Sequence, residues 1–313
     1  GVKFKKNYFY TSKFYQSCKK NNFEVIEIHN RPESLVYLLK KNLKCKFIFV
    51  YHNNPQDLRY SKTVKERLFI VNNCHQIFFV SKWVMKKFFE GMPFDYKNNC
   101  EILYPAINQL KHFPKKQKII IFTGKLNSSK GYDIFGKAII KILNKYPDWK
   151  SNVIGDEPRE EFNFAHNNLN ILGFKNHSEV LLNFEKSSIA VVCSRWNEPF
   201  GRTSLEASSN GCAVIISNKG GLPETITNGV ILNDLTVNTL YKEIRNLILN
   251  DKKRKRLQKL SHKNFYLTNK YVSNLIDKTR SEKLKDPVFF NTRKNKKLRI
   301  LHVTNFNERH DGR

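Results

Sequence analysis

The sequence is short of long apolar runs, of paired cysteines and of acidic residues, and each shortage excludes a class of protein. No apolar run in the 313 residues approaches the roughly 18–20 residues that span a bilayer, so we expect no integral membrane protein. The six cysteines form no Cys-x-x-Cys pair and have no histidine at metal-ligand spacing, which argues against a disulfide framework and a zinc site. No apolar signal-peptide core follows the first residues. We therefore expect a protein of the reducing cytoplasm.

The shortage of acidic residues leaves a strongly basic chain. Lysine and arginine number 56 against 27 aspartate and glutamate residues, which makes the net charge +29. A charge of this sign favours an anionic partner such as nucleic acid, an acidic membrane leaflet or a phosphorylated substrate. A general bias toward lysine and asparagine, which crowd every segment, is an alternative explanation. Composition alone does not choose between the two.

What the chain does contain is typical of a globular α/β protein. Hydrophobic residues make up 40% and aromatic residues 13%, which excludes a disordered or fibrous chain. Short apolar runs alternate with longer mixed stretches, as in the βα units of a parallel sheet. The length predicts about two domains. We expect strands at residues 23–29, 47–52, 76–80, a segment ending at 104, 118–123, 149–154, 169–172, 189–193, 213–217 and 229–232, with helices between them.

The most specific segment is RWNEPFGRTSLEASSNG, residues 195–211. It follows an apolar strand, so its first half lies in the loop at the carboxyl end of that strand, where ligands of doubly wound sheets bind. A helix is expected to begin near Arg202. The backbone N–H groups of Gly201, Arg202 and Thr203 are then unpaired at a helix N-terminus, which suits a phosphate or sugar oxygen.

Glu198 and Glu206 frame this segment. Taken as residues alone, they could touch two ends of one extended ligand, or be a capping carboxylate and a surface glutamate. With Phe200 and Gly201 between them they resemble the E-x7-E motif of family 4 glycosyltransferases, the retaining enzymes of the GT-B fold. The resemblance implies two Rossmann-like domains facing a cleft, with a nucleotide-sugar donor held mainly by the second. It also implies that Glu198 contacts the sugar hydroxyls and Glu206 the ribose.

The loop after the strand at 118–123 reads GKLNSSKG. It is not a Walker A loop, because Lys130 is followed by Gly131 and not by Ser or Thr, so a nucleotide triphosphatase is disfavoured. The loop resembles the family's G-R-L…K-G stretch, in which two cations neutralise the departing diphosphate. Lys130 matches this stretch. Lys125 stands where the family usually has arginine, so a point charge replaces a bidentate fork.

Other glycines support the same resemblance, because each follows an expected strand at a point where a ligand or backbone comes close. They are Gly155, Gly173 and Gly220, in the order and at separations similar to those of the family. The resemblance implies donor-binding roles for Gly124, Lys125, Gly155, Phe200, Gly201, Arg202, Thr203 and Glu206.

Two histidines end strands of the first domain. His52 matches the family histidine that approaches the donor sugar beside the reacting carbon, so the resemblance implies that His52, Lys130 and Glu198 are catalytic. His29 matches an earlier His-bearing loop, although a histidine at a strand end is more often structural. No Asp-x-Asp occurs in the chain, which disfavours the metal-dependent GT-A type. We expect no metal and no other cofactor, with Lys130 and helix N–H groups stabilising the leaving phosphate.

The domain boundary is expected at Pro114, after which a strong strand begins. Residues 1–113 would form a partial N-terminal, acceptor-side domain and residues 114–283 the nucleotide-sugar-binding domain. The resemblance implies that the opening strand and Gly-rich loop of the first domain precede this chain. Residues 284–313 would be a basic linker and a strand, 298–304, that resembles the start of another glycosyltransferase unit. This strand could instead fill the vacant sheet position, but we favour the first interpretation.

The resulting hypothesis is a retaining hexosyltransferase, in the cytoplasm or at the inner face of the membrane. It would move a sugar from a nucleotide-diphosphate-sugar to a glycan or lipid-linked acceptor in cell-surface polysaccharide or lipopolysaccharide synthesis, with a peripheral contact to anionic membrane. A nucleotide-sugar 2-epimerase of the same fold is an alternative, but it needs further acid/base carboxylates that we do not find. A basic nucleic-acid-binding module is the other alternative. No specific nucleic acid is expected, because the basic runs are not interleaved with aromatic residues that stack on bases.

Overall fold

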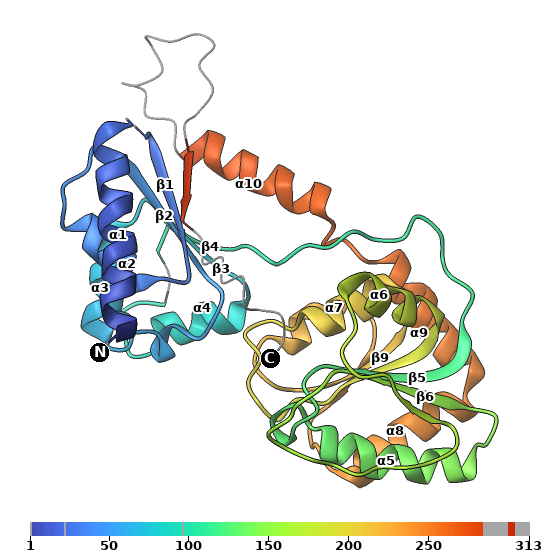
Figure 1. Cartoon of the computed structure of the whole chain (residues 1–313). Helices are drawn as coiled ribbons and strands as arrows, with labels where there is room; N and C mark the ends of the chain where they lie inside the picture. Colours follow the sequence, from blue (N-terminus) through green and yellow to red (C-terminus); the bar gives the residue numbers. More distant parts are fainter. Residues whose placement is uncertain (1, 22, 96, 284–299, 304–313) are drawn as a thin grey trace. The chain divides into compact units, whose positions relative to one another are not determined.

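Figure 1 shows a computed structural model of the chain, which describes residues 2–21, 23–95, 97–283 and 300–303. The chain forms two compact units, one made of Gly1–Tyr104 with Val272–Arg313 and the other of Pro105–Tyr271. Each unit has its own parallel sheet with helices packed against it. The α/β fold with two Rossmann-like units that the sequence predicts is therefore confirmed.

The first unit contains a five-stranded sheet in the order β11-β1-β2-β3-β4, in which all the pairs are parallel. The apolar and aromatic side chains of the middle strands are almost all buried, as expected for a sheet covered on both faces. His29 is opposite Val50 in the pairing of the first two strands, so the residues that follow both strands emerge at one edge. The strands within Gly1–Tyr104 are β1 (Val25–His29), β2 (Lys46–Tyr51), β3 (Gln76–Phe79) and β4 (Cys100–Ile102).

Two helices of the first unit, α3 and α4, begin at polar caps. Thr63 and Glu66 form a capping box at the start of α3, each side chain accepting from the other residue's backbone N–H. The Ser81 hydroxyl caps α4 by accepting from the Val84 N–H at 3.0 Å. Two helices, α1 and α10, lie outside the elements that we expected from the sequence. The helices are α1 (Val2–Lys20), α2 (Pro32–Leu39), α3 (Val64–Asn73), α4 (Lys82–Phe89) and α10 (Asn269–Lys283), with a short 3₁₀ turn η1 (Pro55–Asp57).

Strand β11 (Ile300–Val303) corrects our interpretation of the end of the chain. We expected this strand to begin a separate unit, but it pairs in parallel with β1, with Val25 opposite Ile300 and Ile28 opposite Val303. Figure 1 shows β11 alongside β1. An unpaired β1 would expose a row of backbone N–H and C=O groups, and the added strand satisfies them. Residues 284–299 and 304–313 of the expected linker and strand lie outside the described residues.

The second unit contains a six-stranded parallel sheet in the order β10-β9-β8-β5-β6-β7. From β5 the sheet grows to one side through β6 and β7 and to the other side through β8, β9 and β10. The strand order therefore reverses between β5 and β8, as in a Rossmann sheet, and leaves a crevice at the carboxyl ends of those two strands. The expected strands are confirmed with small changes at their ends. They are β5 (Gln117–Thr123), β6 (Lys150–Ile154), β7 (Leu169–Ile171), β8 (Ser187–Val192), β9 (Ala213–Ser217) and β10 (Val230–Leu232).

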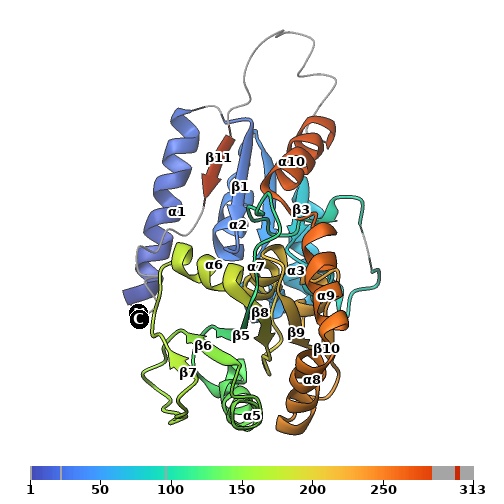
Figure 2. The same ribbon diagram turned by 90° about the vertical axis from the view of Figure 1, so that its right-hand side faces the viewer.

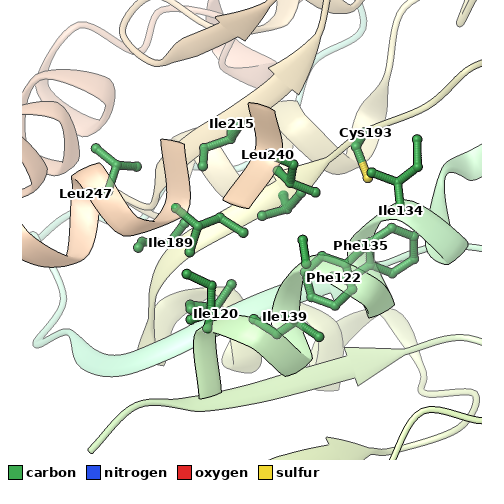
Figure 3. Packing of buried hydrophobic residues seen from close by; sticks show 14 of the residues in the cluster. Ile120, Phe122, Ile134, Phe135, Ile139, Ile189, Cys193, Ile215, Leu240 and Leu247 are labelled. Atoms are coloured by element: carbon green, nitrogen blue, oxygen red, sulfur yellow. The ribbon is translucent and has the colours of Figure 1, made fainter. Parts of the chain in front are cut away.

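Helices cover both faces of this sheet, as Figures 1 and 2 show. One face carries α5 and α8, whose apolar stripes bury Phe135, Ile139 and Leu240 against Ile120 and Ile189 of the strands (Figure 3). The other face carries α6, α7 and α9, and includes a second buried cluster. The helices are α5 (Tyr132–Lys145), α6 (His177–Lys186), α7 (Arg202–Ser209), α8 (Val237–Leu249) and α9 (Asp251–Lys263), with 3₁₀ turns η2 (Ser128–Lys130) and η3 (Leu222–Thr225).

The unit boundary falls earlier than Pro114, between Tyr104 and Pro105. Ile107 bridges to Thr268. The segment that follows is fastened to the second unit by hydrogen bonds from the Gln109 amide to the His262 carbonyl oxygen and from the His262 ring to the Leu110 carbonyl oxygen. The Lys116 ammonium donates to the backbone oxygens of Phe184, Glu185 and Asn210, at 2.9, 3.0 and 2.6 Å. A cation suits the carbonyl oxygens at helix C-termini. These contacts hold the expected hinge in place, so it is part of the second unit.

In the described part of the chain, none of the helices combines the length and the apolar character that crossing a bilayer requires.

Candidate active site

A pocket lies at the strand-order reversal of the second unit, between the loops that follow β5 and β8. Its wall includes six of the residues that the sequence singled out. Phe122, Thr123, Val192, Ser194 and Leu222 complete it, and sequence reasoning did not identify these as site residues. Position alone could have indicated Thr123 and Ser194, because both end or follow strands at the expected crevice. The six expected residues are Gly124, Lys130, Glu198, Gly201, Arg202 and Thr203.

Gly124 opens the loop after β5 in a conformation that only glycine adopts readily, with φ +147°. No atom lies within 4 Å of the position that a Cβ would occupy there, so the backbone faces open space. Gly155 packs against this loop. A Cβ on Gly155 would lie 1.9 Å from the Gly124 carbonyl oxygen, and Gly155 is not among the residues that line the pocket. Its lack of a side chain allows the two loops to pack together.

The rest of the loop after β5 is held by hydrogen bonds to the loop that follows β6. The Asn127 amide donates to Glu157, and Ser128 donates to Glu160 through both its N–H and its hydroxyl. Asn127 also caps the turn η2 by accepting from the Lys130 N–H at 3.0 Å. The backbone from which the Lys130 side chain extends is therefore fixed before any ligand arrives.

Lys130 and Glu198 meet across the pocket. The Lys130 Nζ lies 2.5 Å from the Glu198 Oε1 and 5.1 Å from the centre of the Trp196 ring. Only 28% of the lysine side chain and 13% of the glutamate side chain are exposed, so the pair is partly withdrawn from water. The ammonium is thus held between a carboxylate and an aromatic face, where it is attracted by both.

Arg195 fastens the β8 loop to the start of α5. Its guanidinium forms a bidentate pair with the Asp133 carboxylate, at 2.5 and 2.6 Å, and also donates to the Ser128 carbonyl. These hydrogen bonds hold the pKa of Asp133 below its usual range. Gly131 also allows the loops after β5 and β8 to pack together, because a Cβ there would lie 2.0 Å from the Cys193 carbonyl oxygen. Lys130 and Glu198 are therefore carried by two loops that are joined to each other.

The N-terminus of α7 forms another wall of the pocket. Gly201 is its cap residue, with φ +115° and no side chain to satisfy the first N–H groups of the helix. Arg202 and Thr203 follow it and line the pocket. Phe200 is only 3% exposed and is not a lining residue. The buried Phe200 ring anchors the chain just before the exposed helix end, so its position is that of a packing residue.

Glu206 lies one turn further along α7 and is 7% exposed. Its carboxylate accepts from the exposed His177 ring at 3.0 Å and lies 3.5 Å from the Arg202 guanidinium. Glu206 is outside the set of pocket-lining residues, as is Lys125, whose side chain is exposed on the β5 loop. The structure thus separates Lys125 from the cluster that gathers around Lys130.

His52 belongs to the first unit, where it follows β2. Its Nε2 lies 2.9 Å from the Nδ1 of His29, whose Nε2 lies 2.8 Å from the buried Glu27 carboxylate. The residue as a whole is exposed, but desolvation of its ring and the neighbouring His29 lower the pKa of His52 to about 4. The sequence suggested a site role for His52 and left His29 open, but it did not point to Glu27.

Within residues 2–21, 23–95, 97–283 and 300–303, no group of three or more His, Cys, Asp and Glu side chains could hold a metal ion. The cations that face the pocket are instead protein side chains, Lys130 and Arg202.

Known proteins similar to this chain include glycosyltransferases. The family model described as "Glycosyl transferases group 1" matches residues 105–263, about half of the chain and nearly all of the second unit. Spore coat protein SA of Bacillus subtilis is 27% identical over 282 residues, which cover 78% of this chain and 74% of that protein. The putative glycosyltransferase YtcC of the same organism is 21% identical over 69% of this chain and 60% of its own length.

The fold is also similar to that of solved structures. The crystal structure of Anabaena Alr3699/HepE in complex with UDP-glucose aligns with a TM-score of 0.66. The alignment covers 87% of this chain and 81% of that one, at 16% sequence identity. At this identity the similarity speaks for the fold alone.

Proposed function

The chain belongs to the family of group 1 glycosyltransferases, and from this premise we propose that it transfers a sugar from a nucleotide-diphosphate-sugar donor with retention of anomeric configuration. The observation that carries the proposal is the pocket in which Lys130, Glu198 and the N-terminus of α7 meet at the strand-order reversal. A cation, free N–H groups and a carboxylate at one site match the phosphate and hydroxyl groups of such a donor.

In this proposal the diphosphate lies between Lys130 and the N-terminus of α7. The Lys130 ammonium has three N–H donors, and the first backbone N–H groups of α7 are left without a capping side chain. Gly124 provides open space through which a phosphate can approach the backbone. Lys130 is paired with Glu198 in the free protein. The donor phosphate must therefore compete with the Glu198 carboxylate for the Lys130 ammonium.

The two glutamates of the motif would bind the hydroxyl-bearing parts of the donor. Glu198 would accept hydrogen bonds from the transferred sugar, and Glu206 from the ribose. The His177 ring beside Glu206 adds a polar group near the ribose. His52 would also contact the sugar. Carboxylates that are already ordered by protein partners bind hydroxyl groups at a smaller entropic cost than free side chains do.

We propose that no metal ion takes part. Diphosphate is a good leaving group, so the reaction needs stabilisation of the negative charge that develops on it more than a strong general acid. Lys130 and the helix N–H groups would supply that stabilisation. In this role they act more strongly on the transition state than on the bound donor, which raises the rate and not only the affinity.

The proposed acceptor is a glycan or lipid-linked glycan of the cell surface, and the proposed location is the cytoplasm or the inner face of the membrane. A spore coat protein among the relatives supports a surface glycan. The net charge of +29 supports a peripheral contact with an anionic leaflet, to which each nearby Lys or Arg adds about 1 kcal/mol.

The test is a thermal-shift screen of the full chain against a panel of nucleotide-sugars that begins with UDP-glucose, followed by NMR analysis of the anomeric configuration of the product. We expect one nucleotide-sugar to raise the melting temperature of the wild type and to raise it less in Lys130→Ala. If no member of the panel binds, or if the product has the inverted configuration, the proposal is wrong. A nucleotide-sugar epimerised at C2, with no sugar transferred to an acceptor, would instead favour the epimerase.

A further inference from the structure

Three side chains of the first unit form a continuous line at the carboxyl end of its sheet. Glu27 and His29 lie on β1 two residues apart, which places them on the same face of the strand. The Glu27 Oε1 is 2.8 Å from the His29 Nε2, and the His29 Nδ1 is 2.9 Å from the His52 Nε2. The glutamate side chain is 8% exposed and that of His29 is 25% exposed.

The chemistry of these groups determines where the protons lie when both rings are neutral. An ionised carboxylate only accepts, so the His29 Nε2 carries a proton and the His29 Nδ1 carries a lone pair. The His52 Nε2 must then donate to that lone pair, which leaves the His52 Nδ1 unprotonated. The two ring planes are 21° apart, and an imidazole N–H and lone pair both lie in the ring plane, so the alignment suits this hydrogen bond.

The backbone of His52 is fixed by Asn30, the residue that follows β1. The Asn30 Oδ1 accepts from the backbone N–H groups of His52 and Asn53, both at 3.2 Å. Asn30 has φ +53°, a left-handed conformation that asparagine tolerates better than most residues. The side chain of His52 is thus oriented through His29, and its main chain through Asn30.

We propose that Glu27 and His29 are positioning residues that hold His52 in the Nε2–H tautomer, so that its bare Nδ1 accepts a hydrogen bond from a hydroxyl group of the donor sugar. The inference rests on the proposed function, because it takes the ligand of His52 to be that sugar. A neutral, correctly oriented imidazole discriminates between a hydroxyl, which donates, and an oxygen that can only accept.

The first test is the tautomer itself, measured on the full chain with ¹⁵N-labelled histidine at about pH 8, above the ordinary histidine pKa of about 6.5. We expect the ¹⁵N shifts of wild-type His52 to report a protonated Nε2 and a bare Nδ1. His75, whose Nδ1 accepts from the Phe47 N–H at 3.2 Å, is the internal reference for that pattern. In His29→Phe the His52 Nε2 loses its acceptor and we expect a mixture of tautomers. A wild-type His52 protonated at Nδ1, or one unchanged in His29→Phe, would overturn the proposal.

The second test separates positioning from folding. In His29→Gln the amide can donate to Glu27 and accept from His52, so we expect the wild-type tautomer and normal donor binding to be restored. His29→Phe should weaken the binding of UDP-glucose, or of the nucleotide-sugar that the panel identifies, by about threefold to tenfold, the value of one hydrogen bond. Binding of UDP, which lacks the sugar, should not change.

The outcomes of the two tests also distinguish this inference from the proposed function. Equal losses for UDP and the nucleotide-sugar in His29→Phe would mean that His52 does not act on the sugar, and the inference fails while the donor site stands. If Lys130→Ala and the wild type are alike in binding no nucleotide-sugar, the proposed function fails, whatever the tautomer of His52.

Discussion

The Lys130 ammonium and the Glu198 carboxylate are joined by a 2.5 Å ion pair, although the two residues lie 68 positions apart in the chain. Each is carried by a loop at the carboxyl end of a different strand, β5 for Lys130 and β8 for Glu198. These strands are neighbours in the sheet, so the ion pair lies directly at the strand-order reversal. The pair has the two functional groups that the proposed reaction needs, one for the leaving diphosphate and one for the sugar.

Replacing Lys130 with alanine should lower turnover more than donor affinity. The charge on the leaving diphosphate grows toward the transition state, and removing one aimed donor of this kind costs about 10²–10³ in kcat. Lys141→Ala, at an exposed position of α5, is the matched control and should behave as the wild type. Steady-state kinetics with the identified donor provide the measurement. An increase in KM with kcat unchanged would remove Lys130 from the role proposed for it.

Glu206→Ala should weaken the binding of the nucleoside diphosphate by about 1–3 kcal/mol, because ribose hydroxyls lose their acceptor in a water-poor site. The neighbouring His177 tests whether this effect belongs to the carboxylate. His177→Ala removes one partner of Glu206 but leaves the acceptor in place, so its effect should be smaller. Titration calorimetry with UDP compares the three proteins. Equal affinities for the wild type and Glu206→Ala would place the ribose elsewhere.

Gly131→Ala should destabilise the second unit far more than Gly173→Ala does. Both glycines have a left-handed backbone, with φ +74° and +67°. A left-handed alanine costs about 1–2 kcal/mol. Only at Gly131 would the new Cβ also collide with backbone, at 2.0 Å from the Cys193 carbonyl oxygen, whereas Gly173 has no atom within 4 Å. Melting temperatures of the two variants measure the difference. If they are lowered equally, the packing of the β5 and β8 loops is not as described.

The stability of the protein should fall as the pH is lowered from about 6.5 to about 4, in part because of His52. The pKa of its imidazole is lowered to about 4 in the folded chain, whereas an unfolded histidine has a pKa of about 6.5. In this range the unfolded chain binds a proton that the folded chain does not, so protonation favours unfolding. Above about pH 6.5 the imidazole is neutral in both the folded and the unfolded chain, so the stabilisation from neutral His52 is fully present there.

The variant His52→Gln tests this sign. It should lose less melting temperature than the wild type between about pH 7 and pH 5, since it lacks the group whose folded-state pKa is depressed. His112→Gln, at an exposed position, is the matched control. Replacing His52 also changes its hydrogen-bonded neighbours His29 and Glu27. For this reason the melting temperatures of one variant at two pH values are compared, and not those of different variants at one pH. An unchanged pH dependence in His52→Gln would contradict the low pKa.

Pairing of β11 with β1 should contribute measurably to the stability of the first unit. Successive backbone N–H groups of a strand point to opposite sides, so one of Leu301→Pro and His302→Pro removes a donor that faces β1. We expect that variant to melt several degrees lower than its alanine counterpart, and the other to differ less. Leu301→Ala and His302→Ala retain the N–H groups and are the controls. If both proline variants have the same melting temperatures as their alanine controls, the strand is not built into this sheet.

Much of the fold could be predicted from local sequence alone. The apolar run of β5 and the periodic stripe of α5 place both elements within one residue of their observed ends. The reason is that burial period and capping chemistry act over a few neighbouring residues. Helix α1 was not predicted because it has no such pattern. Its basic and aromatic residues follow one another without an apolar face that spacing could reveal.

The candidate site was predictable in part for the same reason. The E-x7-E segment and the lysine loop could be found because each is contiguous and each follows a strong strand. Lys125, Phe200 and Gly155 were grouped with them because they match the family's motifs, and the fold gives these three an exposed, a buried and a loop-packing position. Sequence distance does not indicate which way a side chain points at the end of a strand.

Local sequence therefore specified most of the strands and helices and the short motifs that follow them, since these depend on neighbouring residues. The pairing of Lys130 with Glu198, the contacts from Glu27 and His29 to His52, and the position of β11 beside β1 came only from the assembled fold. Each of these contacts joins residues on different strands or loops, or fills a sheet edge from the far end of the chain. Their energies depend on strand order and register, which arise when the sheets assemble as a whole.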